Sequence, residues 1–189
     1  GGGGVKALKE VAKHTSSTNL KNIQAKTNAY AKMNKAAFDN ARANVEKMRD
    51  SKGNKLTRQQ QAEEAFALSL AGIKKVFGEK AGLDVMQLML VSVYQSGKMG
   101  GMDVGSGKTW TNVVYFGMNK IILGDKFRAT LGDPSGARTQ YLEGQYLKYF
   151  ETMGLKVFDA VKAHAQHDTK SIIDAHNSAD TIVLIDTTT

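Results

Sequence analysis

The sequence predicts an α/β fold in which helices cover a parallel sheet, preceded by a helical N-terminal extension. Two observations lead to this prediction. Candidate short strands at residues 127–131, near 157 and at 181–185 alternate with helical patterns in the second half of the chain. Before residue 50, helix-forming alanine and lysine dominate. With 189 residues, 41% of them hydrophobic, the chain is long enough for one domain with a sizeable core.

The first part of the chain is expected to be helical. Residues 1–4, all glycine, are interpreted as a flexible leader outside the fold. Residues 15–18 offer N-cap side chains for a helix that carries Leu20, Ile23, Tyr30 and Met33. Turn-forming residues at 50–55 predict a loop. We therefore expect a helical extension over residues 1–56.

A second unit is expected over residues 57–189. Thr57 and Gln60 form a capping-box pattern at the start of a strong helix that Gly78 would end. The apolar run at 85–93 fits a buried helix or a strand, and its leucines and methionines favour helix. Further helices are expected over 108–118, 139–153 and around 170–176, between the predicted strands.

Charge and composition narrow the class of protein. Through Lys80 the chain has 16 basic against 7 acidic residues, whereas the remainder has 10 against 11, so the net charge of +8 comes from the first part. The absence of cysteine excludes disulfides, thiolate nucleophiles and cysteine-ligated zinc. No apolar run is long enough to span a bilayer. We expect a cytoplasmic protein, with a peripheral membrane contact through the basic part as the second option and nucleic acid as the less favoured partner.

The stretch 101–109, GMDVGSGKT, has the chemistry of a phosphate-binding loop. Small residues let the backbone N–H groups of Gly105, Ser106 and Gly107 converge on phosphate oxygens at a helix N-terminus, where the helix dipole also favours negative charge. Lys108 would reach the β and γ phosphates, and the hydroxyl of Thr109 would ligate Mg²⁺. The general pattern has glycine five positions before Gly107, where this chain has Met102.

Several stretches resemble the SecA family, the motor ATPases of bacterial preprotein translocation. The run DVMQLMLVSVYQSGKMGGMDVGSGKT, residues 84–109, is similar to that family's D-V-Q-L segment and to its G-x-I-A-E-M-x-T-G-E-G-K-T loop, in which methionine stands at the position of Met102. LKNIQAKTNAY and AEEAFALSLAGIKKVFG resemble the preceding helices, and TLGDPSGARTQYLEGQYLKYFETMGLKV resembles the next motif and helix. The resemblance implies a P-loop, RecA-like domain.

The resemblance also assigns roles to individual residues. Gln87 would read the adenine edge, Gly105, Ser106, Gly107, Lys108 and Thr109 would hold the phosphates and Mg²⁺, and Arg138 would lie close to the nucleotide. The alternatives are an ordinary helix-surface glutamine for Gln87 and a surface salt bridge for Arg138. Gly100 and Gly101 replace the family's Ala-Glu, and Asp103 and Val104 replace a basic residue and threonine. These departures predict slow ATP turnover.

The acidic pair that motor hydrolysis needs is not evident. Residues 181–185 followed by Asp186 have the form of a magnesium-holding strand, but Thr187 stands where a catalytic glutamate is expected. The favoured interpretation places this strand ahead of the acidic motif, in the front part of a longer motor or in a degenerate relative of one. His164, His167 and His176 are interpreted as solvent-facing side chains, because no third ligand is well spaced for a metal.

The sequence therefore predicts the ATP-binding part of a SecA-like protein translocation motor, with ATP and Mg²⁺ as cofactors. In a full-length parent, ATP hydrolysis would be coupled to movement of a polypeptide through a channel, whereas this chain alone would hydrolyse ATP weakly. Two alternatives remain open. One is a noncatalytic interaction module that retains the motor fold, and the other is a nucleic-acid helicase lobe.

Overall fold

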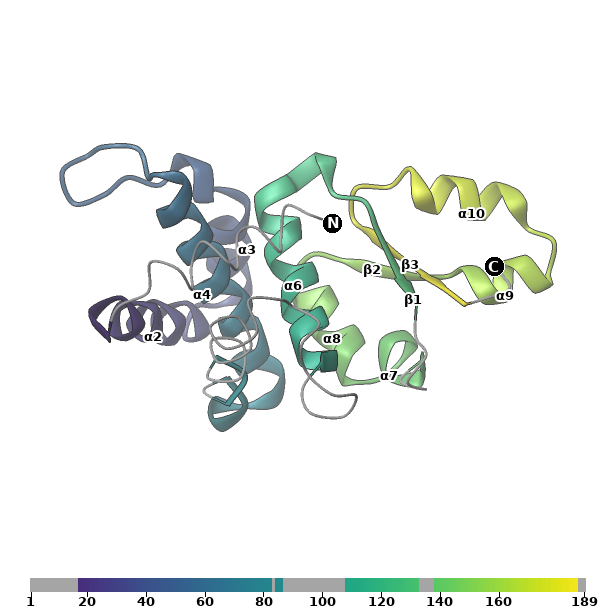
Figure 1. Cartoon of the computed structure of the whole chain (residues 1–189), viewed down its shortest axis with the longest axis horizontal. Coiled ribbons are helices and arrows are strands. Elements are labelled where there is room, and N and C mark those ends of the chain that lie inside the picture. The colour runs from purple at the N-terminus through teal and green to yellow at the C-terminus, as the bar shows by residue number, and fades with distance from the viewer. Residues whose placement is uncertain (1–16, 83, 87–107, 133–137, 187–189) are drawn as a thin grey trace.

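A computed structural model describes residues 17–82, 84–86, 108–132 and 138–186, and these ranges form an α/β fold with a parallel sheet covered by helices, as predicted (Figure 1). The helices are α2 (Ser17–Ala31), α3 (Lys35–Ala43), α4 (Arg58–Phe77), α6 (Lys108–Leu123), α7 (Arg138–Leu142), α8 (Gln145–Thr152), α9 (Ala160–Ala165) and α10 (Thr169–His176), with 3-10 turns η1 (Val45–Lys47) and η2 (Gly124–Lys126). The strands are β1 (Ala129–Gly132), β2 (Lys156–Asp159) and β3 (Thr181–Ile185).

The sheet has the strand order β1-β3-β2, and β3 pairs in parallel with both neighbours. Ala129 lies opposite Ile182, and Val157 pairs with the same residue from the other side. Parallel neighbours require long crossover connections, which here contain α7 and α8 between β1 and β2, and α9 and α10 between β2 and β3. The last predicted strand, 181–185, is confirmed in its bounds.

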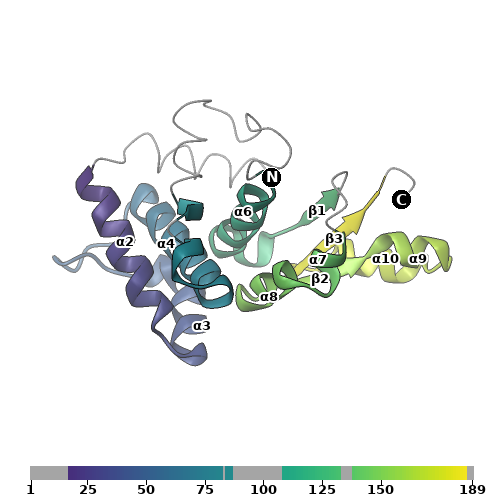
Figure 2. The ribbon, with the colours of Figure 1, turned by 90° about the horizontal axis from the view of Figure 1, so that it is seen from below.

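Both faces of the sheet are covered. Ile182 and Leu184 belong to the main core with α4, α6 and α8, whereas Val183 packs with Ala160 and Ala175 under α9 and α10. A central strand of a parallel sheet buries both faces and therefore reads as a continuous apolar run instead of an alternating one. Figure 2 shows the resulting order, with α2 to α4 at one end, α6 and α8 in the middle, and the sheet with α9 and α10 at the other end.

Helix α4 is the centre of the main core. All residues from Ala65 to Ile73 are buried, so this helix is covered on every side. Its start is fixed by the predicted capping box, in which Thr57 Oγ1 accepts from the Gln60 amide at 3.1 Å and Gln60 Oε1 accepts from the Thr57 amide at 2.8 Å. Its end is fixed by Gly78, which adopts φ 100°, a conformation that favours glycine.

The N-terminal helices join this core through a buried carboxylate. Glu64 of α4 is 6% exposed. Lys26 Nζ lies 2.5 Å from Glu64 Oε1, and the Tyr30 hydroxyl donates to Oε2. Burial and the neighbouring Glu64 carboxylate raise the pKa of Tyr30 above its ordinary value. A buried carboxylate is tolerated only with such partners, so this cluster fixes α2 against α4. Ile23 and Phe38 belong to the same core as residues of α6 and α8. The predicted division of the chain into two units at residues 56/57 stays a prediction.

Two predictions for the second half were wrong in detail. The single helix expected over 139–153 is broken into α7 and α8 at Gly144, whose backbone is extended. The Gln140 side chain occupies the space beside this glycine, where a Cβ would lie 2.3 Å from Gln140 Oε1. That oxygen instead accepts from the Gln145 amide at 3.1 Å. Helix α9 was missed. It begins directly after β2, where Asp159 Oδ1 accepts from the Lys162 amide at 3.1 Å.

The described helices include none with the length and hydropathy needed to cross a bilayer.

A tyrosine slot joins α4, α6 and α8. Tyr149 of α8 is fully buried between two glycines, Gly72 of α4 and Gly117 of α6. A Cβ at Gly117 would lie 2.2 Å from the Tyr149 hydroxyl oxygen, and one at Gly72 would lie 2.7 Å from Met153 Sδ. The hydroxyl of Tyr149 has no hydrogen-bond partner among the described residues. A side chain at Gly117 would therefore collide with the Tyr149 ring, whereas one at Gly72 would first require Met153 to move.

We predict that Gly117→Ala destabilises the fold by about 1–3 kcal/mol through overpacking, despite the roughly 1 kcal/mol that alanine gains in helix propensity. Urea unfolding followed by circular dichroism measures the change. Tyr149→Phe removes the nearest atom and should recover part of the loss in the double variant. Gly132→Ala is the control, because nothing lies within 4 Å of its added Cβ. A Gly117→Ala protein more stable than wild type would contradict the slot.

Candidate functional site

The predicted phosphate loop leads into α6. Gln87, Gly105, Ser106 and Gly107 lie outside the described residues, as do the side chains of Lys108 and Thr109, but the backbone of α6 begins at Lys108. The predicted helix 108–118 is confirmed and extends to Leu123, giving 16 residues. A helix of this length carries about half a positive charge at its amino end. The sequence thus places the glycine loop directly before a full-length helix dipole.

The amino end of α6 lies on the same side of the molecule as the carboxyl end of β1. The two elements run in opposite directions and are joined by η2 at the other side (Figure 1). In α/β sheets, ligands bind beyond the carboxyl ends of the strands. The direction of α6 therefore brings its first turn to the side of the sheet where the strands have their carboxyl ends, and a nucleotide would be expected on that side.

Arg138 also lies at this edge. It begins α7, and its guanidinium forms an ion pair with Asp159, the last residue of β2. The side chain of Arg138 is 44% exposed and that of Asp159 is 18% exposed. Asp159 holds Arg138 with one carboxylate oxygen and caps α9 with the other. The surface salt bridge considered for Arg138 is thus present, whereas its contact with a nucleotide stays a prediction.

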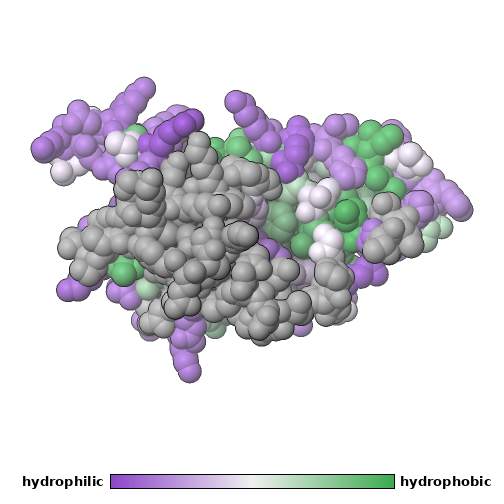
Figure 3. Space-filling model, viewed as in Figure 1, coloured by the Kyte–Doolittle hydropathy of each residue, from purple (hydrophilic) through white to green (hydrophobic). Residues whose placement is uncertain are grey.

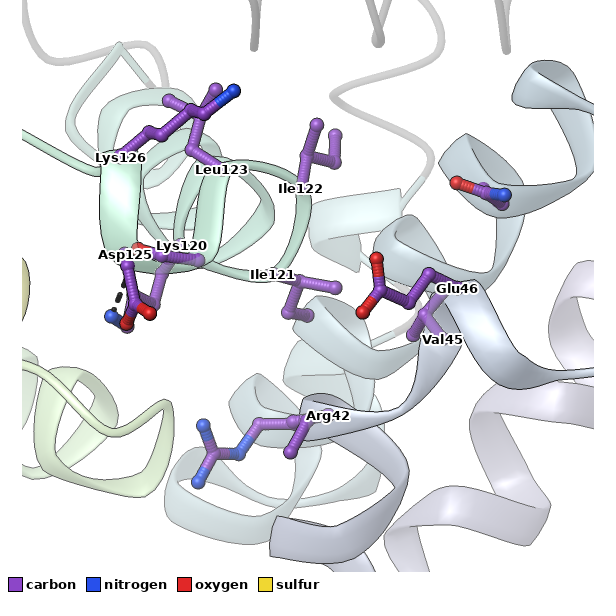
Figure 4. Close-up of a pocket in the computed structure, with 12 residues that line it drawn as sticks. Arg42, Val45, Glu46, Lys120, Ile121, Ile122, Leu123, Asp125 and Lys126 are labelled. Carbon is purple, nitrogen blue, oxygen red and sulfur yellow. Dashed lines mark hydrogen bonds between the residues drawn. The ribbon is translucent and has the colours of Figure 1, made fainter.

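A charged cavity lies at the opposite end of α6. It has a volume of about 530 Å³ between α3 and η1 on one side and the end of α6 with η2 on the other. Figure 4 shows Arg42, Val45 and Glu46 on one wall and Lys120, Ile121 and Asp125 on the other. Among the described residues, its lining from α6 comes from the last turn of that helix, so the cavity lies away from the first turn of α6 and from Arg138.

The charges of this cavity do not suit a phosphate chain. Arg42 donates to the Met153 carbonyl at 2.8 Å and pairs with Asp39 at 2.8 Å, so its charge is already balanced. Lys120 Nζ donates to the carbonyls of Gly124 at 3.2 Å and Ala179 at 2.8 Å. Burial lowers the pKa of Lys120. Lys126 adds a third cation to the lining, but the carboxylates of Glu46 and Asp125 and the negative end of the α6 dipole oppose it, so the cavity offers no convergent positive set.

The described residues contain no group of three or more histidine, aspartate or glutamate side chains arranged to hold a metal ion. His164, His167 and His176 are all exposed, on or beside α9 and α10. Asp186 follows β3 directly, as the strand-then-aspartate pattern predicts.

Sequence reasoning missed two residues that shape these sites. Asp159 follows the predicted strand near Val157 at once, so the same pattern that drew attention to Asp186 could have identified it. Arg42 links α3 to the Met153 carbonyl across 111 positions of sequence, and an added Cβ at Gly154 would lie 2.7 Å from its Nη1. No local pattern around Arg42 signals that contact.

We predict that Asp159→Ala destabilises the fold more than Arg138→Ala. The arginine variant loses a half-exposed pair worth about 0–1 kcal/mol, whereas the aspartate variant also loses a helix cap worth about 1 kcal/mol. Thermal melts of the two single variants and the double variant measure the difference. Equal losses in both single variants would show that the cap contributes nothing.

Comparison of the chain with protein-family models, with curated proteins and with solved structures gave no match. Any functional conclusion therefore rests on the residues themselves and on the arrangement of α6, α7 and the sheet.

Proposed function

We propose that the chain binds ATP with Mg²⁺ through the loop at residues 102–109, as the nucleotide-binding part of a protein translocation motor. The observation that supports this most directly is the start of α6. The glycine loop precedes a 16-residue helix in the sequence. The amino end of this helix lies on the side of the parallel sheet where the strands have their carboxyl ends. Backbone N–H groups and a helix dipole then face the same direction, which is the arrangement that binds phosphate.

The donor set of this segment fits the cofactor. The amides of residues 105–107 would hold phosphate oxygens, Lys108 would place its charge on the β and γ phosphates, and the hydroxyl of Thr109 would ligate Mg²⁺. When bound, Mg²⁺ neutralises charge on the phosphates and orients them for transfer. Arg138 is held at the same edge by Asp159, and in the proposed site it would contribute a second positive charge near the nucleotide.

We interpret Asp186 as lying ahead of the acidic motif and not as the magnesium ligand, because Thr187 follows it where a catalytic glutamate would be expected. Full hydrolysis would then need acidic residues supplied elsewhere in a longer parent, and this chain alone would turn ATP over slowly.

We expect Mg-ATP to raise the melting temperature of the wild-type chain and to leave that of Lys108→Ala unchanged. A ligand at 100 times its dissociation constant that binds only the folded state adds about 2.7 kcal/mol of stability. Lys126→Ala is the matched control, because Lys126 is an exposed lysine at the far end of α6. Scanning calorimetry measures the shift.

Each outcome separates the candidate functions. No shift in the wild-type chain would contradict the proposal and favour a noncatalytic interaction module. An equal shift in wild type and Lys108→Ala would place nucleotide binding away from the loop. ATP turnover that increases on adding nucleic acid would favour a helicase lobe over a protein translocation motor.

A second variant tests the role of the residue after β3. We expect Asp186→Asn to keep the stabilisation by Mg-ATP, because in the favoured interpretation its carboxylate does not ligate Mg²⁺. Melting curves with ATP and Mg²⁺, and with ATP and EDTA, measure the magnesium-dependent part of the shift. Loss of that part in Asp186→Asn alone would identify Asp186 as the magnesium ligand.

A further inference from the structure

The last residue of η1, the loop that follows it and the first residue of α4 form a basic projection. We call residues 47–58 the basic loop. It carries five cations, Lys47, Arg49, Lys52, Lys55 and Arg58, and one carboxylate, Asp50. In Figure 1 it extends beyond the helices, and it forms the hydrophilic projection at the upper left of Figure 3. All five cationic residues are exposed.

The basic loop is an ordered turn. Asp50 Oδ1 accepts from the amides of Lys52 at 2.9 Å and Asn54 at 2.8 Å, and the Asp50 amide donates to the Asn54 carbonyl at 2.9 Å. Gly53 adopts φ 81°, which favours glycine. At its base, half-buried Met48 packs on the main core and its Sδ accepts from the Tyr30 hydroxyl at 3.8 Å. The cations are therefore presented from a fixed support.

The arrangement of positive charges in the basic loop lowers the stability of the folded chain. Arg49 and Lys55 form an antiparallel bridge, which places two positive side chains directly opposite each other. Like charges in that relation repel. The only carboxylate in the loop is directed at backbone amides instead of at a cation. None of the five cations forms an ion pair within the described residues. An anionic partner would remove this repulsion.

We propose that the basic loop binds the phosphate backbone of double-stranded nucleic acid without sequence preference. Lysine, arginine, serine, asparagine and exposed amides are the groups that contact phosphates, and they make up the tip at residues 49–55. That tip has no aromatic or aliphatic side chain. Stacking on single strands needs aromatics, and stable membrane attachment needs an apolar component besides charge. Duplex binding through phosphates needs neither. This inference is independent of nucleotide binding at residues 102–109.

Fluorescence anisotropy with a labelled 20-base-pair DNA of mixed sequence tests the proposal, without nucleotide and between 50 and 200 mM NaCl. Five phosphate contacts predict a slope near −4.5 in log K against log salt, or roughly a 500-fold loss of affinity over this range. The variant Lys52→Glu with Lys55→Glu should bind at least 10-fold more weakly at 50 mM, and its slope should fall by about 2.

The control carries the same change of charge elsewhere. Lys148→Glu with Lys162→Glu alters two exposed lysines on α8 and α9 and should leave the slope unchanged. The proposal is overturned by absence of duplex binding at 50 mM salt, or by equal losses in both double variants, which would reflect net charge alone. It is also overturned if the loop variant loses binding to phosphatidylserine vesicles but not to DNA. Thermal melts confirm that each variant folds.

Discussion

The close approach of α4, α6 and α8 around Tyr149 is the constraint on which the remaining architecture depends. Gly72 and Gly117 provide the space for the tyrosine ring, and α4 in turn holds α2 through Glu64. On the other side, α6 and α8 cover the sheet face that carries Ile182 and Leu184. One aromatic side chain thus connects the N-terminal helices with the α/β part. Its hydroxyl is fully buried beside Ser69 and has no hydrogen bond of standard geometry among the described residues, so packing makes the main contribution at this junction.

Elements with a local physical signal were predictable from the sequence. The capping box at Thr57, the glycine end at Gly78 and the apolar run of β3 each have a cause within a few residues, and all three are confirmed. The break between α7 and α8 depends on Gln140 turning back to cap the next helix, a choice that helical periodicity does not reveal. Helix α9 is too short for a periodic pattern and exists because Asp159 caps it.

The residues of the candidate site also differ in how far the sequence alone could predict their positions. The glycine loop and the helix after it come from one contiguous stretch. The start of α6 predicted from it is confirmed, whereas phosphate binding by the loop stays a prediction. The ion pair of Arg138 could not be predicted from a contiguous stretch of sequence. Its partner lies 21 residues away, at the end of a strand that returns to the same edge only because the sheet is parallel. The charge excess of the first part was visible in composition, but its concentration in a rigid projection depends on the turn around Asp50 and the anchor at Met48.

The order of the strands also determines when the sheet can form during synthesis. Strands β1 and β2 are made first, yet within the described residues neither pairs with the other, and both wait for β3. The helices α2, α4, α6 and α8 are complete before β3 is made, so their mutual contacts do not require that strand. Domains fold as their chain becomes available, at about 5–20 residues per second. Within the described part of the chain, the sheet and the burial of Ile182 and Leu184 in the main core therefore follow only when the third strand is made.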